Sequence, residues 1–147
     1  MPLIIRYPEK IKAGYKSEVL ISSDDLYPTL LEMAGLPLES FQHEDGRSFK
    51  KTAFMASDRT VHKALFWHYP HNRYEAAVRW KNYKMIYEYR TGMCELYDLS
   101  QDLGESHNLA NDAPKVVDKM KKYLAKWLDK TGARYPENGI IIPASYN

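Results

Sequence analysis

The sequence is poor in cysteine, in net charge and in long apolar runs. Its 147 residues include a single cysteine, Cys94, so no disulfide can form within the chain. The 21 Lys and Arg residues are nearly balanced by 19 Asp and Glu residues, which argues against the strongly basic surface of a nucleic-acid-binding protein. No stretch reaches the roughly 18 apolar residues of a membrane-spanning helix, and no signal peptide is visible at residues 1–6. We therefore expect neither a nucleic-acid partner nor a membrane partner.

Aromatic residues, in contrast, are abundant. They make up 13% of the chain, with 12 Tyr, 3 Trp and 4 Phe. Flat aromatic faces are typical of sugar-binding surfaces, but aromatic side chains also fill cores and interfaces. Composition alone therefore does not choose between these uses. A chain of this length can bury a core of ordinary size without disulfides.

The first third of the chain predicts a strand followed by a helix. Residues 2–7 form a nearly continuous apolar run, which is typical of a strand covered on both faces. Residues 22–25 (Ser-Ser-Asp-Asp) are helix-capping residues, and apolar spacing near 3.6 continues to Met33 before Gly35. An apolar run before Asp24 and Asp25 also imitates a metal-binding motif, but the sequence after them favours helix capping.

The remainder predicts an α+β fold. Four short strands over residues 64–68, 75–80, 83–89 and 95–99 are joined by tight turns, so we expect an antiparallel sheet. A helix is predicted over residues 112–130, with Asp112 as N-cap and one apolar stripe that packs on the sheet. The fold class is therefore a four-stranded antiparallel sheet with a packed C-terminal helix, preceded by a strand–helix segment. The Ile140–Ile142 run in the tail is expected to form an edge strand.

Three stretches of the chain carry a family likeness. The first comprises residues 2–8, 11–14 and 25–35. The second is the short motif Asp45-Gly46-Arg47-Ser48. The third comprises residues 78–86, 95–99, 102, 105 and 108–110. In order and spacing, these stretches resemble the last third of bacterial sulfatases of the formylglycine-dependent type.

The resemblance implies a domain layout. Residues 1–35 would be the C-terminal edge of a catalytic α/β domain related to alkaline phosphatase, and residues 36–63 a connecting segment. Residues 64–132 would form the small C-terminal subdomain of sheet and helix, followed by a tail over residues 133–147.

The resemblance also implies which parts of the chemistry lie outside this chain. A complete sulfatase would carry formylglycine and Ca²⁺, act on a sulfated carbohydrate or an aryl sulfate, and be periplasmic or secreted. Formylglycine arises within a Cys/Ser-x-Pro-x-Arg motif, which this sequence lacks; Cys94 is followed by Glu95 and Leu96. We therefore expect no catalytic residue, metal ligand or cofactor in this chain, and no activity by the chain alone.

One loop carries the candidate substrate-binding residues, His68, His71 and Arg73. In related sulfatases the small domain lends loop residues to the rim of the active-site pocket. Histidine can hydrogen-bond to sugar hydroxyls or sulfate, and arginine can pair with an anion. The alternative is a structural strand end, and two histidines fall short of a zinc site. We interpret Arg79, Lys84, Asp102, Glu105 and Asn108 as structural.

Two other functions are compatible with the sequence. The chain could be a stand-alone module that binds sulfated glycans, or part of a phosphodiesterase or phosphotransferase of the same superfamily. In each case the apolar N-terminal segment would lack its partners, and exposed apolar patches promote self-association.

Overall fold

The computed structural model describes residues 3–135 and 140–143. The chain divides into two compact units, Met1–Lys63 and Ala64–Asn147, which we call the first and second units. Within the described ranges, no helix is both long enough and apolar enough to span a membrane.

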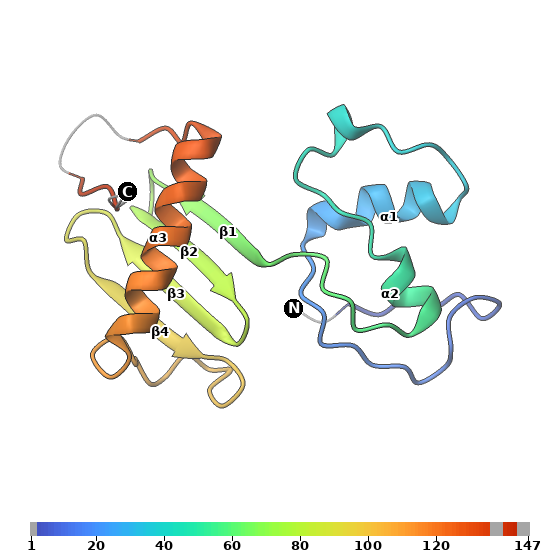
Figure 1. The fold of residues 1–147 in the computed structure, drawn as a ribbon, viewed down its shortest axis with the longest axis horizontal. Helices are drawn as coiled ribbons and strands as arrows, with labels where there is room; N and C mark the ends of the chain where they lie inside the picture. Colours follow the sequence, from blue (N-terminus) through green and yellow to red (C-terminus); the bar gives the residue numbers. More distant parts are fainter. Residues whose placement is uncertain (1–2, 136–139, 144–147) are drawn as a thin grey trace. The chain divides into compact units, whose positions relative to one another are not determined.

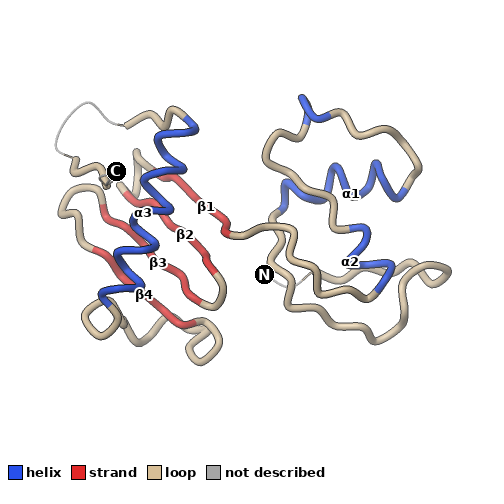
Figure 2. The backbone as a smooth tube through the Cα atoms, in the orientation of Figure 1, coloured by secondary structure: helices blue, strands red, loops and turns tan. Residues whose placement is uncertain are grey.

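The first unit is built from short helices joined by loops (Figure 2). Its elements in chain order are η1 (Ser23–Asp25), α1 (Leu26–Met33), η2 (Ser40–Gln42) and α2 (Lys50–Met55). The predicted helix after residues 22–25 is confirmed as η1 and α1. Gly35 follows α1 with φ of 73°, and the amide of Leu36 donates to the carbonyl of Leu31 at 2.9 Å, so a left-handed glycine ends this helix as expected.

The prediction of a strand over residues 2–7 is wrong for the residues that the structure describes. Residues 3–7 are extended but form no strand in the described part of the chain, and Ile4 is 90% exposed. A strand needs a neighbour to accept and donate its backbone hydrogen bonds. The carbonyl of Tyr7 accepts hydrogen bonds from the amides of Lys10 and Ile11 at 3.0 and 2.8 Å, which form a local turn and not a strand pairing.

The second unit contains the predicted sheet. Strands β1 (Ala64–Tyr69), β2 (Glu75–Trp80), β3 (Tyr83–Glu88) and β4 (Cys94–Asp98) are antiparallel and lie in the order β1-β2-β3-β4. The pair Trp80 and Tyr83 closes the β2–β3 hairpin, leaving Lys81 and Asn82 as its two-residue turn.

Helix α3 (Pro114–Thr131) lies across one face of this sheet (Figure 1). Its buried side chains meet the inward residues of the strands, and Phe66 stacks on Trp127 with ring centroids 5.1 Å apart. Burial of each large apolar side chain stabilises the unit by about 1.5–3 kcal/mol. The fully buried core of the unit includes Ala76, Val78, Met85, Tyr89, Leu96, Met120, Leu124 and Leu128.

The ends of α3 agree with the prediction in part. Pro114 is the first helical residue and Gly132 ends the helix with φ of 60°, as expected. The N-cap is Ala113 and not Asp112, and it makes no side-chain cap hydrogen bond. Pro114 has no amide hydrogen, so one of the four amides that lack an intrahelical partner at a helix start is absent here.

The tail forms isolated contacts in place of the predicted edge strand. The amide of Ile141 donates to the carbonyl of Tyr89 at 2.5 Å, and the hydroxyl of Tyr87 donates to the carbonyl of Ile141 at 3.1 Å. Residues 140–143 nevertheless form no strand. The rest of the predicted tail, residues 136–139 and 144–147, lies outside the described residues.

Candidate functional site

The β1–β2 connection, residues 70–74, carries two of the three predicted substrate-binding residues. His71 and Arg73 are both exposed. The nearest charge partner of Arg73 is Glu75, whose carboxylate lies 4.0 Å from Nη1. At the end of the connection, Tyr74 adopts φ of 56°, and the guanidinium of Arg90 lies 3.7 Å from the centroid of its ring. The fold therefore presents both residues to solvent from an anchored turn.

His68 lies on β1 and has partners inside the second unit. Its Nδ1 is 2.7 Å from the hydroxyl of Tyr89, and its Nε2 is 2.9 Å from the carbonyl oxygen of Arg134. Because a carbonyl only accepts, Nε2 carries the hydrogen, and in the neutral ring Nδ1 accepts from Tyr89. The ring also meets Tyr135 edge-on at 5.3 Å. These contacts favour an anchoring role for His68.

Tyr89 is fully buried beneath this histidine. Burial raises the pKa of its phenol far above the ordinary value, so the hydroxyl stays protonated and keeps donating to His68. His68, Tyr89 and Arg134 thus connect β1, the end of β3 and the segment after α3 beside the loop that carries His71 and Arg73.

In the first unit a buried carboxylate joins three separate segments. Asp25 is completely buried, and both of its side-chain oxygens lie 2.8 Å from Nε2 of His62. The same carboxylate accepts hydrogen bonds from the backbone amides of Ser22 and Arg47, each at 2.7 Å. The interpretation of Asp25 as a helix-capping residue is confirmed by its bond to Ser22, whereas its contact with His62 was not predicted.

The Asp45-Gly46-Arg47-Ser48 motif passes close to η1. A Cβ atom at Gly46 would lie 2.3 Å from the carbonyl oxygen of Asp24. Only glycine permits this approach, which brings the amide of Arg47 to the carboxylate of Asp25. Ser48 continues the contact by donating to the carboxylate of Glu32 in α1. The motif therefore serves the packing of the first unit.

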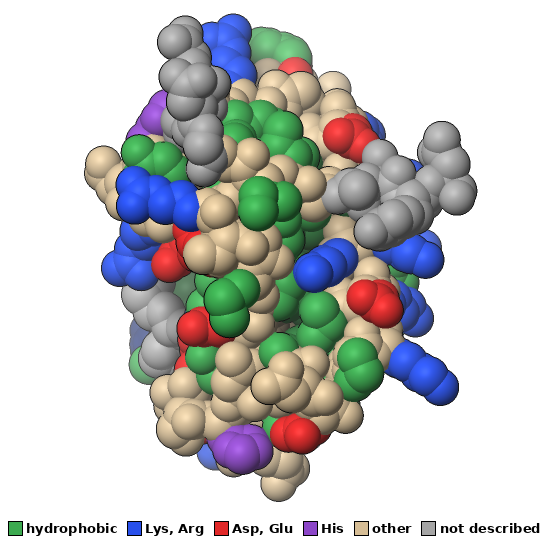
Figure 3. All heavy atoms as spheres, turned by 90° about the vertical axis from the view of Figure 1, so that its left-hand side faces the viewer, with side chains coloured by type: hydrophobic (Ala, Val, Ile, Leu, Met, Phe, Trp, Pro, Cys, Tyr) green, Lys and Arg blue, Asp and Glu red, His purple; other side chains and the backbone are tan. Residues whose placement is uncertain are grey.

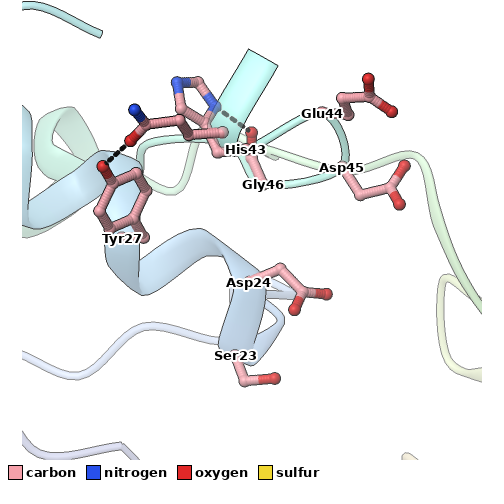
Figure 4. A pocket seen from close by; sticks show the side chains of 8 residues that line it. Ser23, Asp24, Tyr27, His43, Glu44, Asp45 and Gly46 are labelled. Atoms are coloured by element: carbon pink, nitrogen blue, oxygen red, sulfur yellow. Dashed lines mark hydrogen bonds between the residues drawn. The ribbon is translucent and has the colours of Figure 1, made fainter. Parts of the chain in front are cut away.

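A shallow depression of about 420 Å³ lies beside this motif (Figure 4). Asp24, Glu44 and Asp45 are among the residues that line it, together with Tyr27 and His43. Nδ1 of His43 lies 3.3 Å from the carbonyl of Gly46. Three carboxylates would repel a sulfate ester, so the depression is not suited to the anionic group of a sulfated substrate.

The residues interpreted as structural in the second unit form the expected turn before α3. Asp102 accepts hydrogen bonds from the amides of Ser106 and His107, each at 2.8 Å, and the His107 bond lowers the pKa of its carboxyl below the ordinary value. Asn108 accepts from the amide of Leu96 in β4 at 3.0 Å.

Lys84 and Glu105 form an ion pair on the same side of the unit. The ammonium nitrogen of Lys84 lies 2.6 Å from the carboxylate of Glu105, and both side chains are partly buried. Lys84 lies on β3, and its ammonium group is paired with Glu105. This pairing favours a structural role for both residues.

In residues 3–135 and 140–143, no group of three or more His, Cys, Asp or Glu side chains could hold a metal ion. On the face shown in Figure 3, Lys and Arg side chains are interspersed with Asp and Glu and with apolar side chains.

Known proteins are similar to this chain over most of its length. The family described as N-sulphoglucosamine sulphohydrolase, C-terminal, matches residues 1–131. A sulfatase from Formosa agariphila is 34% identical over 90% of this chain, and an N-acetylglucosamine-6-O-sulfatase from Bacteroides thetaiotaomicron is 32% identical over 94% of it.

A solved structure carries the same fold. A protein determined in complex with its substrate D-glucosamine-2-N,6-O-disulfate superimposes on 87% of this chain with a TM-score of 0.68 and 29% identity. The chain spans 28% of the Formosa protein, 26% of the Bacteroides protein and 27% of the solved one. The chain belongs to the sulfatase family and corresponds to the C-terminal part of a sulfatase.

Proposed function

We propose that this chain completes the fold of a sulfatase and forms part of the rim of its substrate pocket. The match of residues 1–131 to a C-terminal family, over about a quarter of each relative's length, supports this division of labour. The formylglycine nucleophile and a Ca²⁺ ion would be supplied by the catalytic region that precedes the matched segment. Alone, the chain hydrolyses no sulfate ester.

The substrate class that fits is a sulfated carbohydrate. The N-acetylglucosamine-6-O-sulfatase and the protein bound to a disulfated glucosamine support this choice over an aryl sulfate. A carbohydrate substrate extends beyond its reacting sulfate, so residues on a rim can bind it without taking part in the chemistry. The relatives from Formosa agariphila and Bacteroides thetaiotaomicron are both named sulfatases, which favours sulfate over phosphate esters.

His71 and Arg73 are the rim residues in this proposal. Both are exposed on the anchored β1–β2 connection. The forked guanidinium of Arg73 can bind a second sulfate or carboxylate of the sugar chain, and the imidazole of His71 can hydrogen-bond to its hydroxyls. His68 would position the connection through its bonds to Tyr89 and Arg134.

The test uses a complete sulfatase in which this chain follows its catalytic region. His71→Ala and Arg73→Ala should raise KM for a sulfated disaccharide about tenfold and leave kcat within about twofold, because the lost contacts bind the ground state and the transition state alike. Lys122→Gln, an exposed change on α3, is the control. Unchanged KM values in both variants would refute the rim assignment.

The chain alone should associate with itself through the first unit. Apolar side chains exposed there include Ile4 at 90%, Leu30 at 62% and Phe41 at 72%, and the catalytic region would cover such a surface in the complete enzyme. Sedimentation velocity should show concentration-dependent dimers or larger species, and Ile4→Lys with Leu30→Glu should shift them towards monomer. A monomer at every concentration would contradict this part of the proposal.

A further inference from the structure

Trp80, the last residue of β2, lies beneath two ammonium groups. One belongs to the next residue, Lys81, and the other to Lys119 in α3. Nζ of Lys81 lies 5.0 Å from the centroid of the Trp80 ring and Nζ of Lys119 lies 4.4 Å from it. Tyr123, one helical turn beyond Lys119 in α3, meets the indole edge-on at 5.8 Å. We call these four residues the Trp80 patch.

The Trp80 patch is a fixed platform with exposed charges. Trp80 is partly buried and packs against the core of the second unit, whereas Lys81, Lys119 and Tyr123 are exposed. Lys81 occupies the hairpin turn with φ of 53°, a conformation in which glycine or asparagine is usual. Such backbone conformations recur at functional positions, and here the turn holds a charged side chain over the ring.

We propose that the Trp80 patch binds a sulfated segment of a polysaccharide, at a site separate from His71 and Arg73. The two ammonium groups lie over the indole ring, so the exposed phenol ring of Tyr123 offers the flat apolar face to the C–H groups of a sugar ring. The two ammonium groups, which are compact point charges, would pair with its sulfates. The choice of a sulfated sugar rests on the proposed function of the complete enzyme.

A nucleic acid could use the same rings and charges by stacking a base and pairing its phosphates. The N-acetylglucosamine-6-O-sulfatase and the protein bound to a disulfated glucosamine favour the sugar over the nucleic acid. A polysaccharide held at the Trp80 patch would remain near the enzyme between cleavage events, which raises the effective concentration of its sulfate esters.

The experiment titrates the 147-residue chain with a heparin hexasaccharide. Calorimetry measures the affinity, and NMR chemical shifts of the indole N–H groups report where the sugar binds. The Trp80 signal should shift, and the fully desulfated hexasaccharide should bind at least about tenfold more weakly. The double variant Lys81→Asn with Lys119→Gln should lose about tenfold in affinity, since asparagine tolerates the turn conformation. Lys122→Gln removes one positive charge from the same helix and should cost less than about twofold.

Several results would overturn the Trp80 patch. These are the absence of binding, an equal loss of affinity in Lys122→Gln, shifts confined to other residues, or equally tight binding of a thymidine decanucleotide. The assay does not involve sulfate hydrolysis. If the complete enzyme hydrolyses sulfated disaccharides while the hexasaccharide fails to bind here, the Trp80 patch is refuted and the proposed function stands.

Discussion

The imidazole of His62 donates to the buried carboxylate of Asp25, with Nε2 placed 2.8 Å from both oxygens. These residues are 37 positions apart in the sequence, and their contact joins η1 to the segment that leads out of the first unit. The carboxylate also accepts two backbone hydrogen bonds, so it organises polar groups that would otherwise be buried without partners.

Asp25→Ala should therefore destabilise the first unit. Removing the carboxylate leaves the imidazole of His62 and two backbone amides without an acceptor, at a cost of about 1–3 kcal/mol for each buried group left unpaired. Amide hydrogen exchange in residues 3–63 measures this loss. The matched control is Asp24→Ala, because Asp24 is exposed and should cost less than about 0.5 kcal/mol. Equal effects of the two substitutions would contradict the role of Asp25.

Gly46→Ala should disrupt the same region by steric overlap. The added methyl group would lie 2.3 Å from the carbonyl oxygen of Asp24, which is backbone and cannot simply rotate away. We expect a loss of about 1–3 kcal/mol in the first unit, seen as faster amide exchange around η1. Gly104→Ala is the control, since its nearest neighbour is a side-chain atom of Asp102 at 3.8 Å. Unchanged amide exchange in Gly46→Ala would contradict the close approach of Gly46 to the carbonyl oxygen of Asp24.

Tyr89→Phe should destabilise the second unit by about 1–2 kcal/mol, because Nδ1 of His68 loses the hydroxyl that donates to it. The three tryptophans, Trp67, Trp80 and Trp127, all lie in this unit, so urea unfolding followed by tryptophan fluorescence reports on it. Tyr69→Phe changes a tyrosine that is 55% exposed and should have almost no effect. If both variants unfold at the wild-type urea concentration, His68 is not anchored as described.

Asp102→Asn should lower the stability of the second unit at neutral pH. The amide of His107 is the main cause that holds the pKa of the Asp102 carboxyl below its ordinary value of 3.8. A lowered pKa in the folded state gives a stabilising contribution that is present above 3.8 and lost as the pH falls through the folded value. The free energies of unfolding of wild type and variant, measured with urea, should therefore become more similar as the pH falls. A constant difference would contradict this account.

The second unit could be predicted from the sequence because its signals are local. Alternating apolar residues and short connections define β1 to β4, and the stripe that includes Val117, Met120 and Leu124 defines the buried face of α3. The strand over residues 2–7 was predicted wrongly for the opposite reason. An apolar run shows that a segment must be covered, whereas a strand also requires a neighbouring backbone.

The polar contacts of the first unit could not be predicted in the same way. His62 lies in a polar segment without periodicity, and nothing local links it to Asp25. Gly46 belongs to a motif that resembles sulfatases, but only the structure gives the physical reason, a backbone approach to Asp24 that excludes a side chain. The rim assignment of His71 and Arg73 stays a prediction, because their exposure is compatible with binding but does not demonstrate it.

The most direct test of the account is sulfate release by the purified 147-residue chain, supplied with Ca²⁺, from 4-nitrophenyl sulfate and from D-glucosamine-2-N,6-O-disulfate. The account predicts no release above the buffer blank, because the formylglycine motif is absent from the chain, and release once a sulfatase catalytic region precedes it. Sulfate release that co-purifies with the chain alone would contradict the assignment of the chemistry to a separate catalytic region.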